Sequence, residues 1–181
     1  MDAALLAELV AFSGIETEFN DAWGKPTQVA AADQLALLAA QGFNIADEDA
    51  ARAELVERQL DFWQQILSPV SVQTLGEPIM FELQVPLVLA NHDFDFLLHT
   101  EQGQRYQFST EPVAGELVQV TVIDEEEYQQ YQHKLDYPLE AGYHRLILTC
   151  KDTEFSFEQR LIITPGSCYQ PAQFAQQKQW G

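Results

Sequence analysis

The residues with the clearest capacity for chemistry are carboxylates, which are abundant in this chain. Asp93 and Asp95 are two residues apart, so both side chains fall on one face of an extended segment and offer two oxygen ligands to a calcium ion. No loop of alternating oxygen ligands surrounds them, and we therefore interpret them as solvated charges at a sheet edge. The run from Asp124 to Glu127 lies between two predicted strands, where mutual repulsion favours an exposed turn.

Histidine and cysteine side chains are few and scattered. His92 lies in a predicted turn, whereas His133 and His144 fall on apolar strand faces, which is typical of hydrogen-bonded core histidines rather than of metal ligands or catalytic bases. Cys150 and Cys168 are too few for a disulfide framework, and we interpret them as reduced thiols. No nucleophile elbow, phosphate loop, zinc-protease motif or Cys-x-x-Cys pair occurs. We therefore predict no catalytic residue, no cofactor and no metal site.

Aromatic side chains are the remaining candidates for a binding site, because sugar rings stack on exposed aromatic faces. Most of the 3 Trp, 6 Tyr and 11 Phe fall on apolar strand or helix faces, so we expect them in a core. Trp23 instead lies in a predicted turn, and Tyr128 and Tyr137 flank the segment around Tyr131. Trp23, Tyr128 and Tyr137 are therefore the predicted sugar-stacking residues.

Composition limits the classes of partner. The chain has 181 residues, of which 46% are hydrophobic, which is enough for one good core or two small ones. Its net charge of −19 repels phosphate backbones and anionic membrane surfaces, so we expect neither nucleic acid nor membrane as a partner. The acidic start and the lack of an apolar run of about 18 residues favour a cytoplasmic location.

The first part of the chain has helical periodicity, which ends at about residue 67. Gly14 and Gly42 are placed to end the first two helices in the left-handed conformation. Asp47 can cap the third helix, which Ser68-Pro69 stops, and a turn or short hairpin is expected within residues 15–29. The apolar stripes consist of Leu5, Leu6, Leu9, Val10 and Phe12; Leu35, Leu37, Leu38 and Ala39; and Leu55, Val56, Leu60, Phe62, Trp63, Ile66 and Leu67.

From Val70 onward apolar residues alternate, which predicts about eight short strands separated by turns. No helical crossover fits between the strands, so we expect antiparallel pairing and no parallel sheet. Residues 139–143 partly resemble the tyrosine corner of immunoglobulin-like sandwiches, with Tyr143 as its tyrosine. The predicted fold class is α+β, with an N-terminal helical subdomain followed by an antiparallel immunoglobulin-like β-sandwich. The predicted core-facing positions include Val70, Val72, Phe81, Leu83, Val85, Phe94, Phe96, Leu98, Tyr106, Phe108, Val118, Val120, Val122, Tyr131, His133, Leu135, Leu146, Leu148, Cys150, Phe155, Phe157, Leu161 and Ile163.

Two ordered sets of residues resemble a known family. The residues after Ile163 form a glutamine-rich tail that is too apolar for a solvated terminus and too short for another core, which is typical of a connector. The two sets are Gly14, Ile15, Phe19, Asp21, Gly24, Val29, Leu37, Leu38 and Gly42, then Gly142, Tyr143, His144, Leu146, Leu148, Pro165, Cys168, Tyr169, Pro171 and Gln177 to Gly181. In this order they are similar to the N-terminal region of long bacterial amylomaltases, the 4-α-glucanotransferases of glycoside hydrolase family 77.

The resemblance implies that the chain is truncated before a catalytic (β/α)₈ barrel. The expected domains are a helical subdomain over 1–67, the sandwich over 68–166 and a linker toward the barrel over 167–181. The parent enzyme would transfer α-1,4-glucan segments between maltodextrins, while this fragment alone would not be an enzyme. Its expected partners are the parent's own barrel and linear α-1,4-glucan. Two alternatives stay open, namely an α-glucan-binding module and a free-standing immunoglobulin-like interaction protein.

Overall fold

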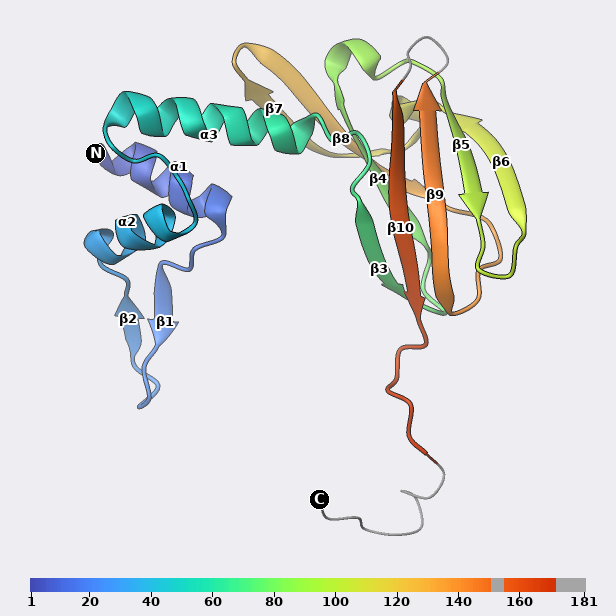
Figure 1. Cartoon of the computed structure of the whole chain (residues 1–181), viewed down its shortest axis with the longest axis horizontal. Coiled ribbons are helices and arrows are strands. Elements are labelled where there is room, and N and C mark those ends of the chain that lie inside the picture. The colour runs from blue at the N-terminus through green and yellow to red at the C-terminus, as the bar shows by residue number, and fades with distance from the viewer. Residues whose placement is uncertain (151–154, 172–181) are drawn as a thin grey trace. The chain divides into compact units, whose positions relative to one another are not determined.

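A computed structural model of the chain describes residues 1–150 and 155–171 (Figure 1). The chain divides after Phe62 into two compact units, a helical unit over Met1–Phe62 and a second unit that begins at Trp63. None of the helices in the described ranges has the length and apolarity needed to cross a membrane.

The helical unit contains the three predicted helices and the predicted hairpin. Gly14 ends the first helix with a φ of 69°, and the Ala50 backbone N–H donates to the Asp47 carboxylate at 2.8 Å at the start of the third. Both expected helix boundaries are therefore confirmed. The bounds are α1 Ala3–Ser13, β1 Glu18–Asn20, β2 Pro26–Gln28, α2 Ala31–Ala40 and α3 Glu48–Trp63, and the core consists of Leu5, Leu9, Val10, Leu38, Phe43, Ala51 and Leu55.

The third helix ends earlier than its apolar stripe predicts. It stops at Trp63, and Ile66 and Leu67 are buried in the core of the second unit rather than on a helix face. The backbone N–H of Gln84 donates to the Ile66 carbonyl at 2.9 Å, so this segment already bonds to a strand. The prediction that the helix continues to Ser68 was wrong because these apolar residues pack onto a sheet instead.

The second unit is a β-sandwich, which confirms the predicted α+β class. Its sheets contain five strands in the order β3-β10-β9-β5-β6 and three strands in the order β4-β8-β7 (Figure 1). The side chains between the two sheets form one apolar core that includes Phe81, Phe94, Phe96 and Leu148. The bounds are β3 Val70–Thr74, β4 Met80–Pro86, η1 Leu87–Leu89, β5 Phe94–His99, β6 Arg105–Thr110, η2 Pro112–Ala114, β7 Glu116–Ile123, β8 Glu126–Lys134, β9 Gly142–Cys150 and β10 Ser156–Thr164.

One strand pair departs from the antiparallel expectation. β10 pairs with β3 in parallel, with Ile162 opposite Val72, whereas the other pairs are antiparallel. Parallel neighbours need a long connection, and the six strands between β3 and β10 supply it without a helix. The expectation that parallel pairing is excluded was therefore wrong for this pair.

Several predicted core positions are exposed, and the tyrosine corner does not form. Val70 and Val72 lie on the outer face of β3, and Val118, Val120 and Val122 are exposed on the edge strand β7. Alternation alone does not show which face of a strand another layer covers. Tyr143 is 69% exposed, unlike the buried tyrosine of a tyrosine corner. The linker predicted over 167–181 lies partly outside the described residues, which end at 171.

Candidate functional site

Trp23 is the most exposed of the three predicted sugar-stacking residues. It lies in the turn between β1 and β2 and is 90% exposed. The Asp21 carboxylate accepts hydrogen bonds from the backbone N–H groups of Trp23 and Lys25 at 2.9 and 2.8 Å, which fixes the turn. The indole ring is therefore presented to solvent by a defined backbone.

Tyr128 is buried and does not offer a ring face to a sugar. It is 3% exposed and packs against Trp63, with ring centroids 6.1 Å apart and ring planes 52° apart. Burial raises the pKa of its hydroxyl, and the hydrogen bond that this hydroxyl donates to Glu126 raises that pKa further. The sequence placed Tyr128 at the end of a strand but could not show that Trp63 covers it.

Tyr137 is half-buried and lies in a different environment. Its ring stacks on Tyr106, with centroids 4.7 Å apart, and lies 5.5 Å from the ring of Phe108. One face of Tyr137 is therefore occupied by the sandwich itself. Tyr128 and Tyr137 have different ring partners, so the structure does not bring them together as one stacking surface.

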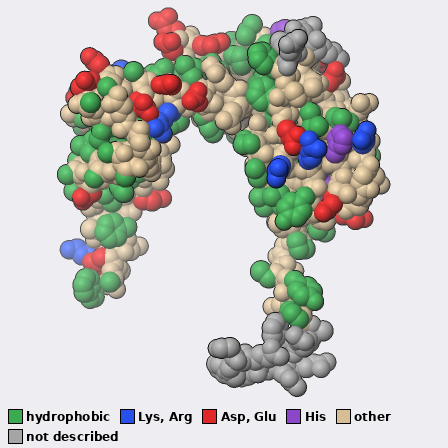
Figure 2. Space-filling model, in the orientation of Figure 1, with side chains coloured by type: hydrophobic (Ala, Val, Ile, Leu, Met, Phe, Trp, Pro, Cys, Tyr) green, Lys and Arg blue, Asp and Glu red, His purple; other side chains and the backbone are tan. Residues whose placement is uncertain are grey.

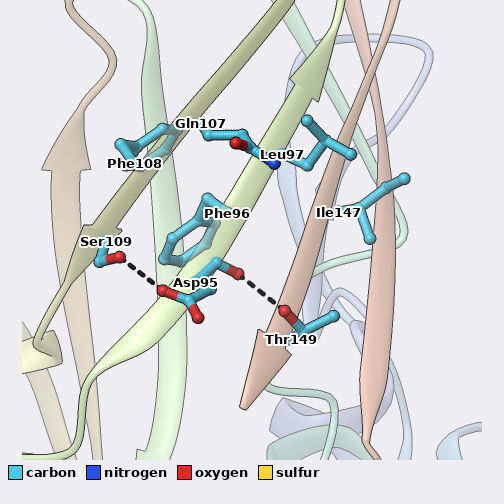
Figure 3. A pocket seen from close by; sticks show the side chains of 8 residues that line it. All are labelled: Asp95, Phe96, Leu97, Gln107, Phe108, Ser109, Ile147 and Thr149. Atoms are coloured by element: carbon cyan, nitrogen blue, oxygen red, sulfur yellow. Dashed lines mark hydrogen bonds between the residues drawn. The ribbon is translucent and has the colours of Figure 1, made fainter. Parts of the chain in front are cut away.

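The outer face of the five-stranded sheet carries a groove of about 480 Å³ that the sequence did not reveal. Its lining includes two pairs of directly opposed residues, Leu97 with Ile147 and Asp95 with Thr149. Figure 3 shows side chains from three neighbouring strands converging here. The residues that line the groove are Asp95, Phe96, Leu97, Gln107, Phe108, Ser109, Ile147 and Thr149.

Hydrogen bonds hold the polar side of this groove in place. The Ser109 hydroxyl donates to the Asp95 carboxylate at 2.5 Å, and the Thr149 hydroxyl donates to the Asp95 carbonyl oxygen at 3.4 Å (Figure 3). The side chains thus offer hydroxyl, carboxylate and amide groups beside the aliphatic surface of Leu97 and Ile147. Such a surface suits a polyol, because polar groups bond to its hydroxyls while aliphatic groups contact its C–H face.

The groove is not equipped for cleavage of a glycosidic bond. That chemistry uses two carboxylates across the scissile bond, and Asp95 is the single carboxylate among the described residues that line the groove. Asp93 precedes β5 and is exposed. The groove can bind a ligand through its polar groups, but its own side chains do not form a catalytic pair.

Sequence patterns contain no signal for this groove because its polar residues alternate with core residues along their strands. Gln107, Ser109 and Thr149 are ordinary polar residues on amphipathic strands, and each is unremarkable alone. They meet because β6, β5 and β9 are neighbours in the sheet, although β9 is separated from β5 and β6 along the chain by β7 and β8. Only the strand order and register place them side by side.

The two histidines that were predicted to lie in the core are both buried and hydrogen-bonded. The Glu101 backbone N–H donates to His144 Nδ1 at 3.3 Å, and His144 Nε2 lies 2.9 Å from the Glu140 carbonyl oxygen, so the backbone contacts both ring nitrogens. His133 is 8% exposed and its Nε2 lies 3.1 Å from the Pro112 carbonyl oxygen. Burial lowers the pKa of His133, and the hydrogen bond to Pro112 offsets part of that effect.

The acidic run lies only in part in the exposed turn that was predicted for it. Asp124 and Glu125 form the tight turn between β7 and β8, with φ values of 49° and 67°, and both are exposed. Glu126 and Glu127 already belong to β8. Neither Cys150, which is buried, nor Cys168, which is exposed, forms a disulfide.

A family described as the MalQ N-terminal beta sandwich domain matches residues 66–165. The 4-alpha-glucanotransferases of Mycobacterium bovis and Mycobacterium tuberculosis are 27% identical to this chain over 185 residues, which cover 99% of this chain and 24% of each relative. The chain thus spans about a quarter of the length of these relatives.

A solved structure shows the same fold. The amylomaltase from Corynebacterium glutamicum superposes with a TM-score of 0.64 and 22% sequence identity, over 90% of this chain and 23% of that chain. The similarity includes most of both units, since it extends beyond the length of either one alone.

Proposed function

This chain belongs to the family of MalQ N-terminal beta sandwich domains, and on that premise we propose that it is the non-catalytic N-terminal accessory region of a 4-α-glucanotransferase. The observation that carries the proposal is the family match over residues 66–165, together with similarity along nearly the whole chain to about a quarter of two 4-alpha-glucanotransferases. The remaining part of such an enzyme would hold the catalytic (β/α)₈ barrel, which is the proposed partner of this region.

The reaction of the proposed parent enzyme is transfer of α-1,4-glucan segments between maltodextrins. A carboxylate would hold the glycosyl group covalently after the α-1,4 bond breaks, and the 4-hydroxyl of a second glucan would accept it in place of water. In this proposal the described residues support that reaction without performing it. The groove supports an accessory role because it offers a single carboxylate.

Glucose release from maltotriose tests this function. The purified 181-residue chain should release none, while the longer polypeptide that carries it should release glucose as it disproportionates the trisaccharide. Glucose release by the purified chain would show that this region is itself catalytic. A longer polypeptide without transfer activity would contradict the assignment to a glucanotransferase.

The second candidate function is binding of linear α-glucan, which the groove on β5, β6 and β9 and the exposed Trp23 both favour. Affinity electrophoresis in gels that contain glycogen or amylose separates the two functions, because an architectural region migrates unretarded. Gln107→Ala removes an amide from the groove, and Trp23→Ala removes the hairpin ring. If the gel retards the original chain but not one of these variants, glucan binding is assigned to the site that this variant changes.

The remaining assignments stay proposals with their own tests. The proposed domain ranges 1–67, 68–166 and 167–181 are tested by limited proteolysis, which should separate the helical subdomain from the sandwich and cut again after 166. A cytoplasmic location is testable by fractionation of cells that express the protein. A free-standing interaction protein, the third reading, would be encoded by a reading frame that ends at Gly181.

A further inference from the structure

A row of basic side chains crosses the outer face of the five-stranded sheet. Arg105 on β6 lies opposite His99 on β5, His99 lies opposite Arg145 on β9, and Arg145 lies opposite Arg160 on β10. We name these four residues the basic row. Since neighbouring strands are about 4.8 Å apart, the row is about 14 Å long. Figure 2 shows basic and histidine side chains in a line across the sandwich.

The basic row is unusual for this chain. Three of its members are among only 9 Lys and Arg residues in a chain of net charge −19. Directly opposed like charges, such as Arg145 and Arg160, destabilise a sheet, so this arrangement opposes folding. Charges retained at such a cost are explained most directly by an anionic partner.

Internal ion pairing leaves most of this charge available. Glu158 accepts two hydrogen bonds from Arg145, at 2.8 and 2.5 Å. That pairing lowers the pKa of Glu158, and the nearby charges of Arg160 and His99 lower it further. Among the described residues no ion pair or hydrogen bond is formed by the side chains of Arg105 and Arg160, and the buried Nε2 atom of His99 has no partner.

An apolar row lies directly beside the basic row. Tyr143 is opposite Ile162, and Ile162 is opposite Val72. These three side chains therefore form a line that is parallel to the basic row and on the same face of the sheet. Tyr143 is 69% and Val72 is 62% exposed. Arginine and tyrosine beside aliphatic side chains are typical of the centre of protein interfaces.

We propose that the basic row and the apolar row together form a docking surface for an acidic protein surface on the region that follows this domain in the longer enzyme. This inference rests on the proposed function. A neutral glucan has no charge for the basic row to recognise, and a small phosphate would leave the apolar row unused. A second copy of the chain carries the same charge of −19 and is repelled as a whole.

The topology also places the following region close to this surface. β10, which contributes Arg160 and Ile162, is the last strand of the sandwich along the chain (Figure 1). A region attached after β10 is therefore tethered beside the face that β10 helps to form, which raises its effective concentration there.

Covalent footprinting of Tyr143 tests the docking surface. Tyr143 should be modified at least about fivefold more slowly in the longer enzyme than in the 181-residue chain, while Trp23, which is 90% exposed, serves as the internal reference. The double variant Arg105→Glu/Arg160→Glu should restore the reactivity of Tyr143 in the longer enzyme. Both side chains lack an internal ion pair among the described residues, so the variant breaks none in the sandwich.

Matched variants and separate readouts make each outcome decisive. Lys134→Glu reverses one charge away from the basic row and removes only the exposed ion pair with Asp136, and Arg105→Lys/Arg160→Lys preserves the charge, so both should leave Tyr143 protected. If Tyr143 reacts as fast in an active longer enzyme as in the 181-residue chain, the docking surface is overturned and the proposed function still stands. Protection in the 181-residue chain that grows with its concentration, or with added maltoheptaose, would assign the face to a second copy or to glucan and would overturn the proposal. A longer polypeptide without glucan transfer would remove the proposed function and this inference with it.

Discussion

Trp63, the last residue of α3, covers Tyr128 on β8, with their ring centroids 6.1 Å apart. Both side chains are almost fully buried, and both belong to the second unit. The contact holds Trp63 against β8, where the chain enters the sandwich. The segment that follows, between Trp63 and β3, lies beside β4, because the backbone N–H of Gln84 donates a hydrogen bond to the Ile66 carbonyl.

Tyr128→Ala should destabilise the sandwich by about 3–5 kcal/mol, since it leaves a large cavity under Trp63. Tyr128→Phe keeps the ring and loses only the hydrogen bond to Glu126, which corresponds to about 1 kcal/mol. Urea unfolding measures both. Tyr143→Ala is the exposed control, and equal effects of Tyr128→Ala and Tyr143→Ala would show that the contact with Trp63 does not stabilise the unit.

The buried His133 should make stability depend on pH. Burial lowers its pKa in the folded state, while the pKa of the unfolded side chain is about 6.5. Below that pH the unfolded state takes up a proton that the folded state does not, so the free energy of unfolding should fall as pH decreases below about 6.5 and level off below the folded pKa. His133→Gln should lose this slope between about pH 5 and 7, and identical slopes would exclude His133 as its source.

Leu83 and Leu117 provide a matched test of the core boundary. Both lie directly opposite Tyr131 of β8, Leu83 on β4 and Leu117 on β7. Leu83 is nevertheless 0% exposed, whereas Leu117 is 50% exposed. Leu83→Ala should therefore cost about 2–5 kcal/mol and Leu117→Ala about 1 kcal/mol or less. Chemical denaturation compares the two, and similar losses would mean that β7 is covered in solution.

The cap at Asp47 should stabilise the helical unit. Asp47→Ala removes the acceptor of the Ala50 N–H and should destabilise this unit by about 1 kcal/mol. Asp47→Ser retains a capping oxygen and should behave like the original protein. Circular dichroism during thermal unfolding measures the difference, and a loss of stability in Asp47→Ser as large as in Asp47→Ala would point to lost charge rather than lost capping.

The sequence by itself determined most of the secondary structure and the class of the fold. Helix ends were predictable at Gly14 and Asp47 because glycine in the left-handed conformation and a capping carboxylate act within one turn of the backbone. The change from helical to alternating periodicity predicted a helical unit before a sandwich, because the spacing of apolar residues follows the geometry of a helix in the first part and of strands in the second. His133 and His144 were correctly placed in the core for the same reason.

Tertiary structure alone decided which faces are covered and which strands are neighbours. The burial of Tyr128 depends on Trp63, which is 65 residues away along the chain, and the exposure of Val120 depends on β7 being an edge strand. The groove and the basic row exist because the register of β6, β5, β9 and β10 aligns residues from separate segments. Such alignment is set by packing across the whole sandwich, and no local pattern of residue types encodes it.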